Sequence, residues 1–262
     1  MQSIRSMLLL CVYLLEANTM SFATTPQLFD RLEYQGKSYS VVISLLERRF
    51  SEYGSVGFTS QSSDNHKGYE ATWGIRDGVL YLDKFTGWVG RNEVTLENDW
   101  PTLTPTPTPT KADWISGEVN IVPGALTTNS IGKTVEGALS LFFVDGELIQ
   151  TTKLRKFEIG SNEGGIGISL ALNSGRKVVV KEVFPGSPCA EHSFVKSGVK
   201  VIAVQTQGRE TSVSDSLSRA IGLIRGSVRT DVTVVFEDQE QETKSITLSR
   251  VSLTKLVKLT LD

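Results

Sequence analysis

The sequence predicts a mostly β fold with some α structure, that is, a β-rich α+β protein. We expect an N-terminal antiparallel sheet domain followed by a smaller C-terminal β domain with one or two helices. Two Asp-Gly pairs, Asp77-Gly78 and Asp145-Gly146, each separate strand-like runs of aromatic and apolar residues. Further along, short apolar runs alternate with glycine turns around one amphipathic helix. The 262 residues suffice for one large domain or two ordinary ones.

The composition excludes several classes of protein. A net charge of −2 without a dominant block of one sign argues against a nucleic-acid partner. Two cysteines and two histidines cannot build a conventional four-ligand zinc site once Cys11 is removed with a signal peptide. Cys189 would then be the single cysteine, so no internal disulfide is expected. We therefore expect no metal and no cofactor.

The N-terminus has the pattern of a secretory signal peptide over residues 1–23. Arg5 provides the positive charge, "MLLLCVYLL" (7–15) the short apolar core, and "SFA" (21–23) the small residues before a cut. Nine apolar residues are too few to span about 30 Å of hydrocarbon. We expect a periplasmic or secreted chain that begins near Thr24 and is not inserted in the membrane. An uncleaved anchor and a buried helix are the alternatives.

Residues 24–155 are predicted to form the N-terminal β-rich domain. Asp-Gly suits the type I′ turn of a hairpin, because both central residues of that turn take positive φ. A Pro-Thr tract (101–110) favours extended backbone without N–H donors. We expect it to be a loop that joins two parts of one sheet domain, since each flanking part is too small to bury a core. A linker between domains is the alternative.

Aromatic residues recur through this N-terminal part. We expect them to fill the core of the sheet, and an exposed face that stacks on sugars or peptides is the alternative. They are Trp73, Tyr81, Trp88, Trp100 and Trp114.

The C-terminal part contains one strongly marked helix, predicted from Ser214 to Arg225. Ser212 or Ser214 can cap its start, and Gly226 can end it in a left-handed conformation. One face is apolar at helical spacing, which is more typical of core packing than of a ligand site. That face consists of Val213, Leu217, Ala220, Ile221 and Ile224.

The stretch "GGIGISLAL" (164–172) brings paired glycines directly before a strand. Dinucleotide-binding motifs place their glycines after a strand, and here Leu170 stands where the third glycine would be. A loop with successive exposed N–H groups can instead hold an anion, and the free edge of the next strand can pair with an extended peptide. The loop Gly164 to Gly167, the strand Ile168 to Leu172 and the helix could together bind a peptide through its terminal carboxylate.

Several segments of this region resemble a known family. They are "GGIGISLAL", "VVVKEVFPGSPCAE", "SGVKVIAV", the helix with "GSVRTDVTVVF", and "SITLSR". Residues 158–253 resemble the PDZ domain of bacterial carboxy-terminal processing peptidases, within a domain predicted at 156–262. The resemblance implies a small β-barrel or sandwich in which the N–H groups of Ile166, Gly167 and Ile168 receive the peptide carboxylate.

The resemblance also implies a set of peptide-binding residues. The side chains of Ile166 and Ile168, with those of Leu217 and Ile221, would form the pocket for the last peptide residue. The full candidate set is Gly165, Ile166, Gly167, Ile168, Ser169, Leu170, Ser214, Leu217, Ser218 and Ile221. The sequence departs from the family at Val199, where the family has an Asp that orders a turn, and in the connector before it. These departures put the width of the groove in doubt.

The remaining features do not define an active site. The family's Ser-Lys protease domain would follow the PDZ domain, but the sequence stops at Asp262. Residues 30–155 weakly resemble bacterial proteins of unassigned function, which implies no activity. Cys189 and His192 are close in sequence, but no third catalytic group is evident, and His66 lies in a polar loop.

Two hypotheses follow for the function. The first is an exported, non-catalytic adaptor that binds protein C-termini or extended peptides, with an envelope protease or a secretion component as a candidate partner. The alternative is a hydrolase with an active site in the N-terminal domain that the PDZ domain regulates. A cleft with converging polar groups in the N-terminal domain would favour the hydrolase, and a filled aromatic core would favour the adaptor.

Overall fold

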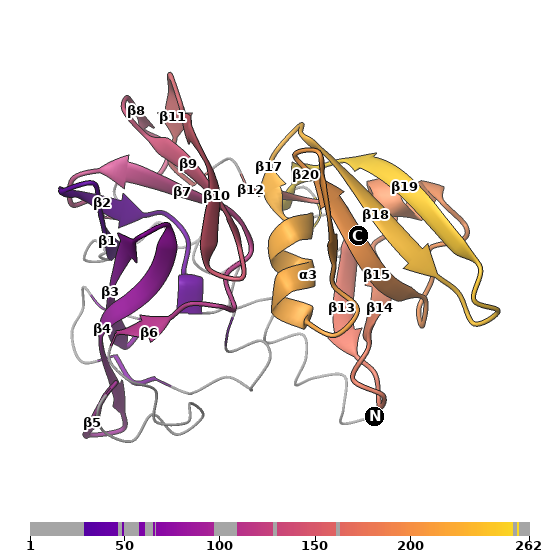
Figure 1. Ribbon diagram of the computed structural model, residues 1–262, viewed down its shortest axis with the longest axis horizontal. Helices are drawn as coiled ribbons and strands as arrows, with labels where there is room; N and C mark the ends of the chain where they lie inside the picture. Colours follow the sequence, from indigo (N-terminus) through magenta and orange to yellow (C-terminus); the bar gives the residue numbers. More distant parts are fainter. Residues whose placement is uncertain are drawn as a thin grey trace.

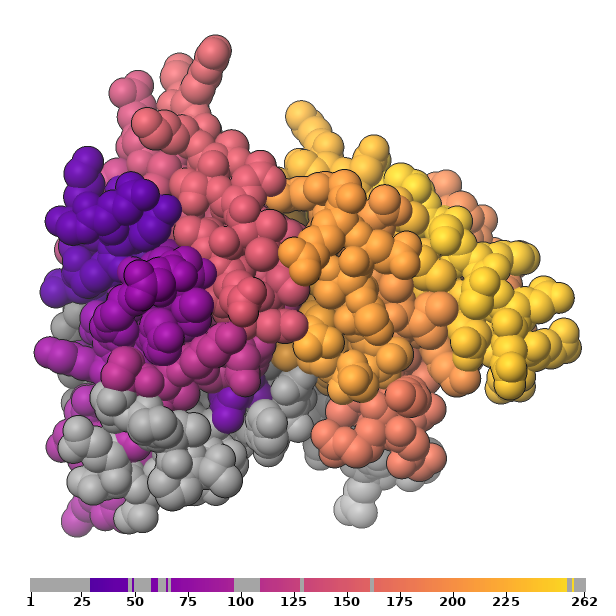
Figure 2. Space-filling model, viewed as in Figure 1, coloured from indigo at the N-terminus to yellow at the C-terminus, as the bar shows by residue number. Residues whose placement is uncertain are grey.

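The computed structural model describes residues 29–46, 49, 58–60, 65, 67–96, 109–127, 130–160, 163–253 and 256. Two β assemblies lie side by side, with one α-helix, α3 (Leu217–Ile224), between them (Figure 1). The space-filling view shows the two assemblies in contact along the middle of the molecule (Figure 2). This architecture confirms the predicted β-rich α+β class. The predicted signal peptide, Pro-Thr residues 101–108, His66 and Trp100 lie outside the described residues.

The N-terminal assembly is one sheet that closes on itself. Its strands are β1 (Asp30–Tyr34), β2 (Lys37–Val41), β3 (Tyr69–Arg76), β4 (Val79–Val89), β5 (Asn92–Thr95), β6 (Thr110–Lys111), β7 (Gly117–Pro123), β9 (Leu139–Val144) and β10 (Glu147–Lys153). The strand order is β10-β9-β7-β2-β1-β3-β4-β5, and the pairing of Glu147 in β10 with Val79 in β4 closes the ring. We call this assembly the closed sheet.

The closed sheet is antiparallel except at one place. β1 pairs with β3 in parallel, and the other pairings of the sheet are antiparallel, as predicted. Strands on both sides of the Pro-Thr tract belong to this sheet, because β3 to β5 precede the tract and β6 and β7 follow it. A separate two-stranded ladder joins β8 (Thr134–Val135) and β11 (Phe157–Glu158).

Both predicted Asp-Gly hairpins are present. Asp77 and Gly78 have φ angles of 50° and 76° in the turn between β3 and β4. Asp145 and Gly146 have φ angles of 50° and 77° between β9 and β10. Positive φ at both central residues is the type I′ geometry that suits the twist of a hairpin.

Aromatic and aliphatic side chains fill the interior of the closed sheet. Trp73 is 0% exposed and Trp114 is 4% exposed, and their rings meet edge to face with centroids 6.3 Å apart. The guanidinium of Arg49 lies 4.4 Å from the centroid of the Trp114 ring. Trp73 and Trp114 are therefore core residues, whereas Tyr81 and Trp88 are half-buried.

The C-terminal assembly is a six-stranded antiparallel sheet with a small three-stranded sheet beside it. The larger sheet contains β13 (Ile168–Leu172), β14 (Val178–Val183), β15 (Lys200–Thr206), β16 (Arg209–Ser212), β18 (Asp231–Glu237) and β19 (Thr243–Ser249). The smaller sheet contains β17 (Gly226–Ser227), β12 (Glu163–Gly165) and β20 (Val251–Ser252). A 3₁₀-helix, η2 (Pro188–Glu191), follows β14. Among the described residues, no helix is long and apolar enough to cross a membrane.

The helix α3 begins later than predicted. Neither Ser212 nor Ser214 caps it, because the carbonyl of Ser214 accepts a hydrogen bond from the N–H of Val178 at 2.9 Å and holds the chain in a turn. Ser216 is the N-cap, and its hydroxyl accepts a hydrogen bond from the N–H of Arg219 at 3.3 Å. A contact between elements distant in sequence thus decided which serine caps the helix.

The end of α3 also differs from the prediction. Gly226 does not take a left-handed conformation but enters β17 and pairs with Gly164. The buried guanidinium of Arg250 instead donates to the carbonyls of Ile224 at 2.7 Å and Leu223 at 2.9 Å. It satisfies carbonyl groups at the helix end that a glycine cap would otherwise satisfy. A Cβ at position 226 would lie 3.0 Å from the guanidinium carbon of Arg250, so glycine leaves room for this contact.

Candidate functional site

The strand β13 is an edge strand of the larger C-terminal sheet. It pairs with β14 on one side, and no other described strand pairs with it. The N–H of Phe184 donates to the carbonyl of Gly167 at 2.9 Å, so the next pair, Ile168 with Val183, is of the non-hydrogen-bonded type. In such a pair the backbone N–H and C=O point away from the neighbouring strand. Ile168 therefore presents both groups to the open edge.

A tight turn at Ile166 and Gly167 connects β12 to β13. The predicted loop from Gly164 is shorter in the structure, because Gly164 and Gly165 already belong to β12. The carbonyl of Ile166 accepts from the N–H of Cys189 at 3.1 Å, and the carbonyl of Gly167 accepts from the Ser187 hydroxyl at 3.2 Å. Both carbonyls are thus turned inward. Among the described residues, the N–H groups of Ile166 and Gly167 donate no hydrogen bond within the turn.

Apolar side chains from the turn, β13 and α3 belong to one hydrophobic cluster. Ile166 is 1% exposed and Leu217 is 8% exposed, while Ile168, Leu170 and Ile221 are half-buried against the same core. The structure therefore brings the predicted pocket residues together around the open edge of β13. Side chains of this composition suit contact with an apolar ligand group.

Two predicted site residues, Ser214 and Ser218, lie away from the open edge of β13, and the hydroxyl of a third, Ser169 in β13, is buried. Ser218 is 1% exposed and shares a helix face with Gly222, whose carbonyl meets Gly117 of the closed sheet. Ser214 precedes α3 and lines a hollow on the outer surface. The hydroxyl of Ser169 is buried and lacks a hydrogen-bond partner in the described structure. Ser218 directly follows Leu217 in α3, so its side chain lies on a different face of the helix, and Ser214 precedes the first residue of the helix.

The sequence analysis missed the residues that pack on the glycines of the turn. The pairing of β20 with β12 carries the chain past Gly165, where a Cβ would lie 3.0 Å from Leu253 and 3.5 Å from Leu256. Leu256 is 3% exposed and would lie 3.2 Å from a Cβ at Gly167. These leucines form an apolar backing for the turn, and only their position after "SITLSR" could have indicated it.

Val199, where the sequence departs from the family, is a core residue. It is 3% exposed, and its carbonyl accepts a hydrogen bond from the N–H of Val180 at 2.8 Å. Gly198 before it has a φ of 90°, and its N–H donates to the carbonyl of Val180 at 2.8 Å. Backbone hydrogen bonds thus order this turn without an aspartate at position 199.

Cys189 is buried within the C-terminal core, where it belongs to the same hydrophobic cluster as α3. It is 0% exposed, and burial raises the pKa of its thiol from the ordinary 9.0 to about 12. A nucleophilic cysteine needs the opposite shift, because the thiolate is the reactive form. His192 donates its backbone N–H to the carbonyl of Cys189 at 3.1 Å. The Cys189–His192 pair therefore lacks the features of an activated nucleophile.

The buried thiol predicts a pH dependence of stability. Above pH 9 the unfolded chain ionises Cys189 while the folded chain keeps the proton until about pH 12, so stability falls as the pH rises. Between pH 8 and pH 10 we expect the free energy of unfolding to fall by about 1.4 kcal/mol more in the native protein than in Cys189→Val. Urea unfolding at both pH values measures this difference. Identical pH slopes for the two proteins would contradict it.

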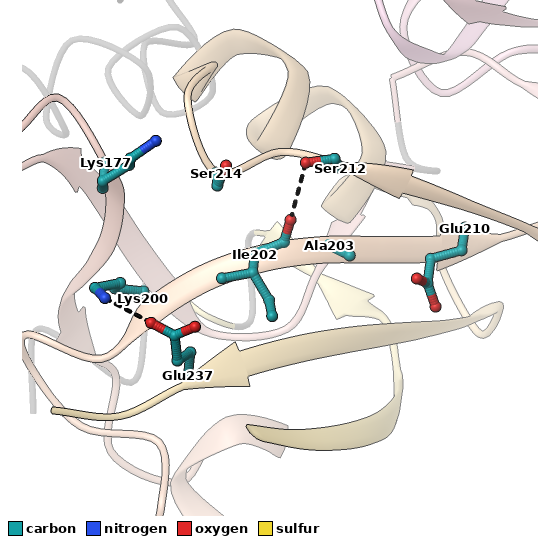
Figure 3. A pocket seen from close by; sticks show the side chains of 8 residues that line it. All are labelled: Lys177, Lys200, Ile202, Ala203, Glu210, Ser212, Ser214 and Glu237. Carbon is teal, nitrogen blue, oxygen red and sulfur yellow. Dashed lines mark hydrogen bonds and ion pairs between the residues drawn. The ribbon is translucent and has the colours of Figure 1, made fainter. Parts of the chain in front are cut away.

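Two hollows of the described surface lie in the C-terminal assembly. The larger, about 500 Å³, is lined by side chains of β15, β16 and β18 and by Lys177 and Ser214 (Figure 3). Its charged groups are partly paired, because Lys200 and Glu237 are 2.5 Å apart. The smaller, about 370 Å³, lies between η2 and β19 near His192 and Lys244. Neither hollow includes β13 or α3, and within the described chain no three His, Cys, Asp or Glu side chains could hold a metal ion.

The chain resembles known proteins over part of its length, in solved structures alone. No protein-family model matches this chain, and no curated protein matches it. Among the solved structures that match, two are similar over 36% of the chain. One is the photosystem II D1 C-terminal processing protease, with 28% identity and a TM-score of 0.31, and the matched part spans 24% of that protein. The other is the PDZ domain of the carboxy-terminal protease from Vibrio cholerae in complex with peptide, with 23% identity and a TM-score of 0.32, covered over 97% of its length.

Proposed function

We propose that residues 163–253 form a PDZ-type domain and that the chain is a non-catalytic adaptor for peptide C-termini. The observation that carries this proposal is the open edge of β13, which lies beside α3. The strand β13 begins directly after the turn at Ile166 and Gly167. An extended peptide adds to this edge as a further antiparallel strand, and Ile168 supplies both a donor and an acceptor to it.

The carboxylate of the peptide sits at the turn. The carbonyls of Ile166 and Gly167 point inward, so the N–H groups of the turn are the groups available to an anion. The last side chain of the peptide packs on Ile168, Leu217 and Ile221, which belong to one hydrophobic cluster. We therefore expect ligands with an apolar last residue.

The closed sheet favours the adaptor over the hydrolase. Large apolar side chains fill its interior, with Trp73, Phe143 and Leu82 each 0% exposed. This is the filled core that the adaptor hypothesis expects of the N-terminal domain. In the proposed role the adaptor works outside the cytoplasm and presents a bound protein to an envelope protease or a secretion component, and cell fractionation tests that location.

Amidation of the peptide is the direct test of this function. We expect peptides selected from a C-terminal library to bind about tenfold or more weakly once their C-termini are amidated, because hydrogen bonds to a charged acceptor contribute about 1.5–3 kcal/mol. Fluorescence anisotropy with labelled peptides measures the change in Kd. Changes in the backbone amide chemical shifts of residues 166–170 on addition of peptide locate the site. Equal affinity of free and amidated peptides would count against the proposal.

A further inference from the structure

The helix α3 is packed on two sides. Leu217, Ala220 and Ile224 face the core of the C-terminal assembly. Ser218 and Gly222, one turn apart, lie on the face toward the closed sheet, and Figure 1 shows the helix between the two assemblies. The helix that walls the groove is therefore in contact with the N-terminal half of the chain.

The closest contact joins two backbones. Gly117 at the start of β7 has a φ of 99°, and a Cβ there would lie 2.5 Å from the carbonyl carbon of Gly222 and would overlap its oxygen. Beside this point Phe142 and Val144 of β9 are 5% and 8% exposed and belong to the same hydrophobic cluster as α3. A side chain at position 117 would force the closed sheet and the helix apart.

Polar contacts to the closed sheet hold both ends of α3. Near its start, Arg219 donates to the carboxylate of Asp145 at 2.8 Å. Just after its end, Ser227 donates to the carboxylate of Glu118 through its N–H at 3.0 Å and its hydroxyl at 2.8 Å. Contacts at two ends and in the middle fix the position of the helix along its length.

We infer that the closed sheet sets the affinity of the peptide site by positioning α3, with Gly117, Glu118 and Asp145 as positioning residues. This inference rests on the proposed function, because it concerns the same groove between β13 and α3. A helix that moves from β13 removes Leu217 and Ile221 from the bound peptide. By thermodynamic reciprocity, a peptide that prefers the docked helix also strengthens the contact between the closed sheet and α3.

Two glycines of one strand region provide the test. Gly117 and Gly124 flank β7, both with positive φ (99° and 82°), but no heavy atom lies within 4 Å of a Cβ at Gly124. Gly117→Ala and Gly124→Ala therefore share the backbone strain, and only the first creates a clash with α3. For a peptide with a free carboxylate, we expect Kd to rise about tenfold in Gly117→Ala and to stay within about twofold in Gly124→Ala.

A second pair of variants keeps the test independent of the glycine backbone. Asp145→Arg removes the closer of two carboxylate partners of Arg219, since the carboxylate of Asp215 lies 3.6 Å from the same guanidinium. We expect Kd to rise about threefold, because the pair with Asp145 is partly exposed. The exchange Asp145→Arg with Arg219→Asp restores the pair and the affinity. Glu147→Arg is the control. Glu147 lies in the same hairpin as Asp145, and its replacement breaks an ion pair with Lys111 of β6 at 3.5 Å that does not involve α3.

Hydrogen exchange of residues 217–224 separates this inference from the proposed function. Faster exchange in Gly117→Ala than in Gly124→Ala supports positioning by the closed sheet, and slower exchange in native protein with bound peptide supports the coupling. Equal affinity and equal exchange in the two alanine variants would overturn the inference. A native protein that binds no free-carboxylate peptide overturns the proposed function, and the exchange rates still report on the helix.

Discussion

Replacing Arg250 by alanine is expected to lower the free energy of unfolding by about 3–5 kcal/mol, because it removes a buried charge from a network that depends on it. Arg250 is 4% exposed, and its guanidinium joins the end of α3 to the strands beside it. Besides the two helix carbonyls, it donates to the Thr230 hydroxyl at 2.8 Å and to the carbonyl of Asp231 at 3.1 Å. Alanine would leave four buried or partly buried acceptors without their donor.

Two nearby carboxylates oppose the effect of burial on the charge of Arg250. Burial lowers the pKa of Arg250, whereas the carboxylates of Glu118 and Asp231 raise it. Glu118 belongs to β7 of the closed sheet, so the balance involves both assemblies. Arginine keeps its charge at every ordinary pH, which a site with this desolvation needs.

Two further variants separate the contribution of the Arg250 hydrogen bonds to stability from the contribution of its charge. Arg209→Ala, an exposed arginine of β16, is expected to change the free energy of unfolding by less than about 0.5 kcal/mol. Arg250→Lys keeps the charge but not the planar set of donors, so we expect it to lie between Arg250→Ala and the native protein. Urea unfolding monitored by tryptophan fluorescence measures all three. A loss below about 1 kcal/mol in Arg250→Ala would contradict the role assigned to the guanidinium.

The sequence predicted those parts of the fold that depend on neighbours along the chain. The type I′ hairpins at Asp77-Gly78 and Asp145-Gly146 follow from local backbone preferences. The strand Ile168–Leu172 was also predicted at its observed place, whereas the turn before it is shorter than the predicted loop, because Gly164 and Gly165 belong to β12. The edge strand of the candidate site is one contiguous segment, which explains why its position could be predicted from local sequence.

Features decided by distant contacts could not be predicted. The cap of α3 shifted to Ser216 because β14 holds the carbonyl of Ser214, and the helix end depends on Arg250, which is 26 residues beyond Ile224. The closure of the N-terminal sheet requires β4 to meet β10 across the intervening strands. The contact between Gly117 and Gly222 likewise has no local pattern, since it arises only from the packing of β7 on α3.

Gly167→Ala is expected to lower the free energy of unfolding by about 2–4 kcal/mol and to abolish peptide binding. The φ of Gly167 is 85°, a conformation that strains a residue with a Cβ. The added Cβ would also overlap the Cβ and Oγ of Ser187, which is 1% exposed and cannot move aside. The clash displaces the turn, and with it the N–H groups that we assign to the carboxylate.

Two further variants divide this effect between strain and clash. Gly198→Ala has a similar φ of 90° and open space around its Cβ, so it measures the strain, about 1 kcal/mol. Ser187→Gly removes the atoms that a Cβ at position 167 would meet. In a double-mutant cycle, Gly167→Ala with Ser187→Gly should therefore lose less stability than the sum of the single changes. Strict additivity would mean that the contact with Ser187 does not require glycine at 167, and the left-handed backbone would then be its whole explanation.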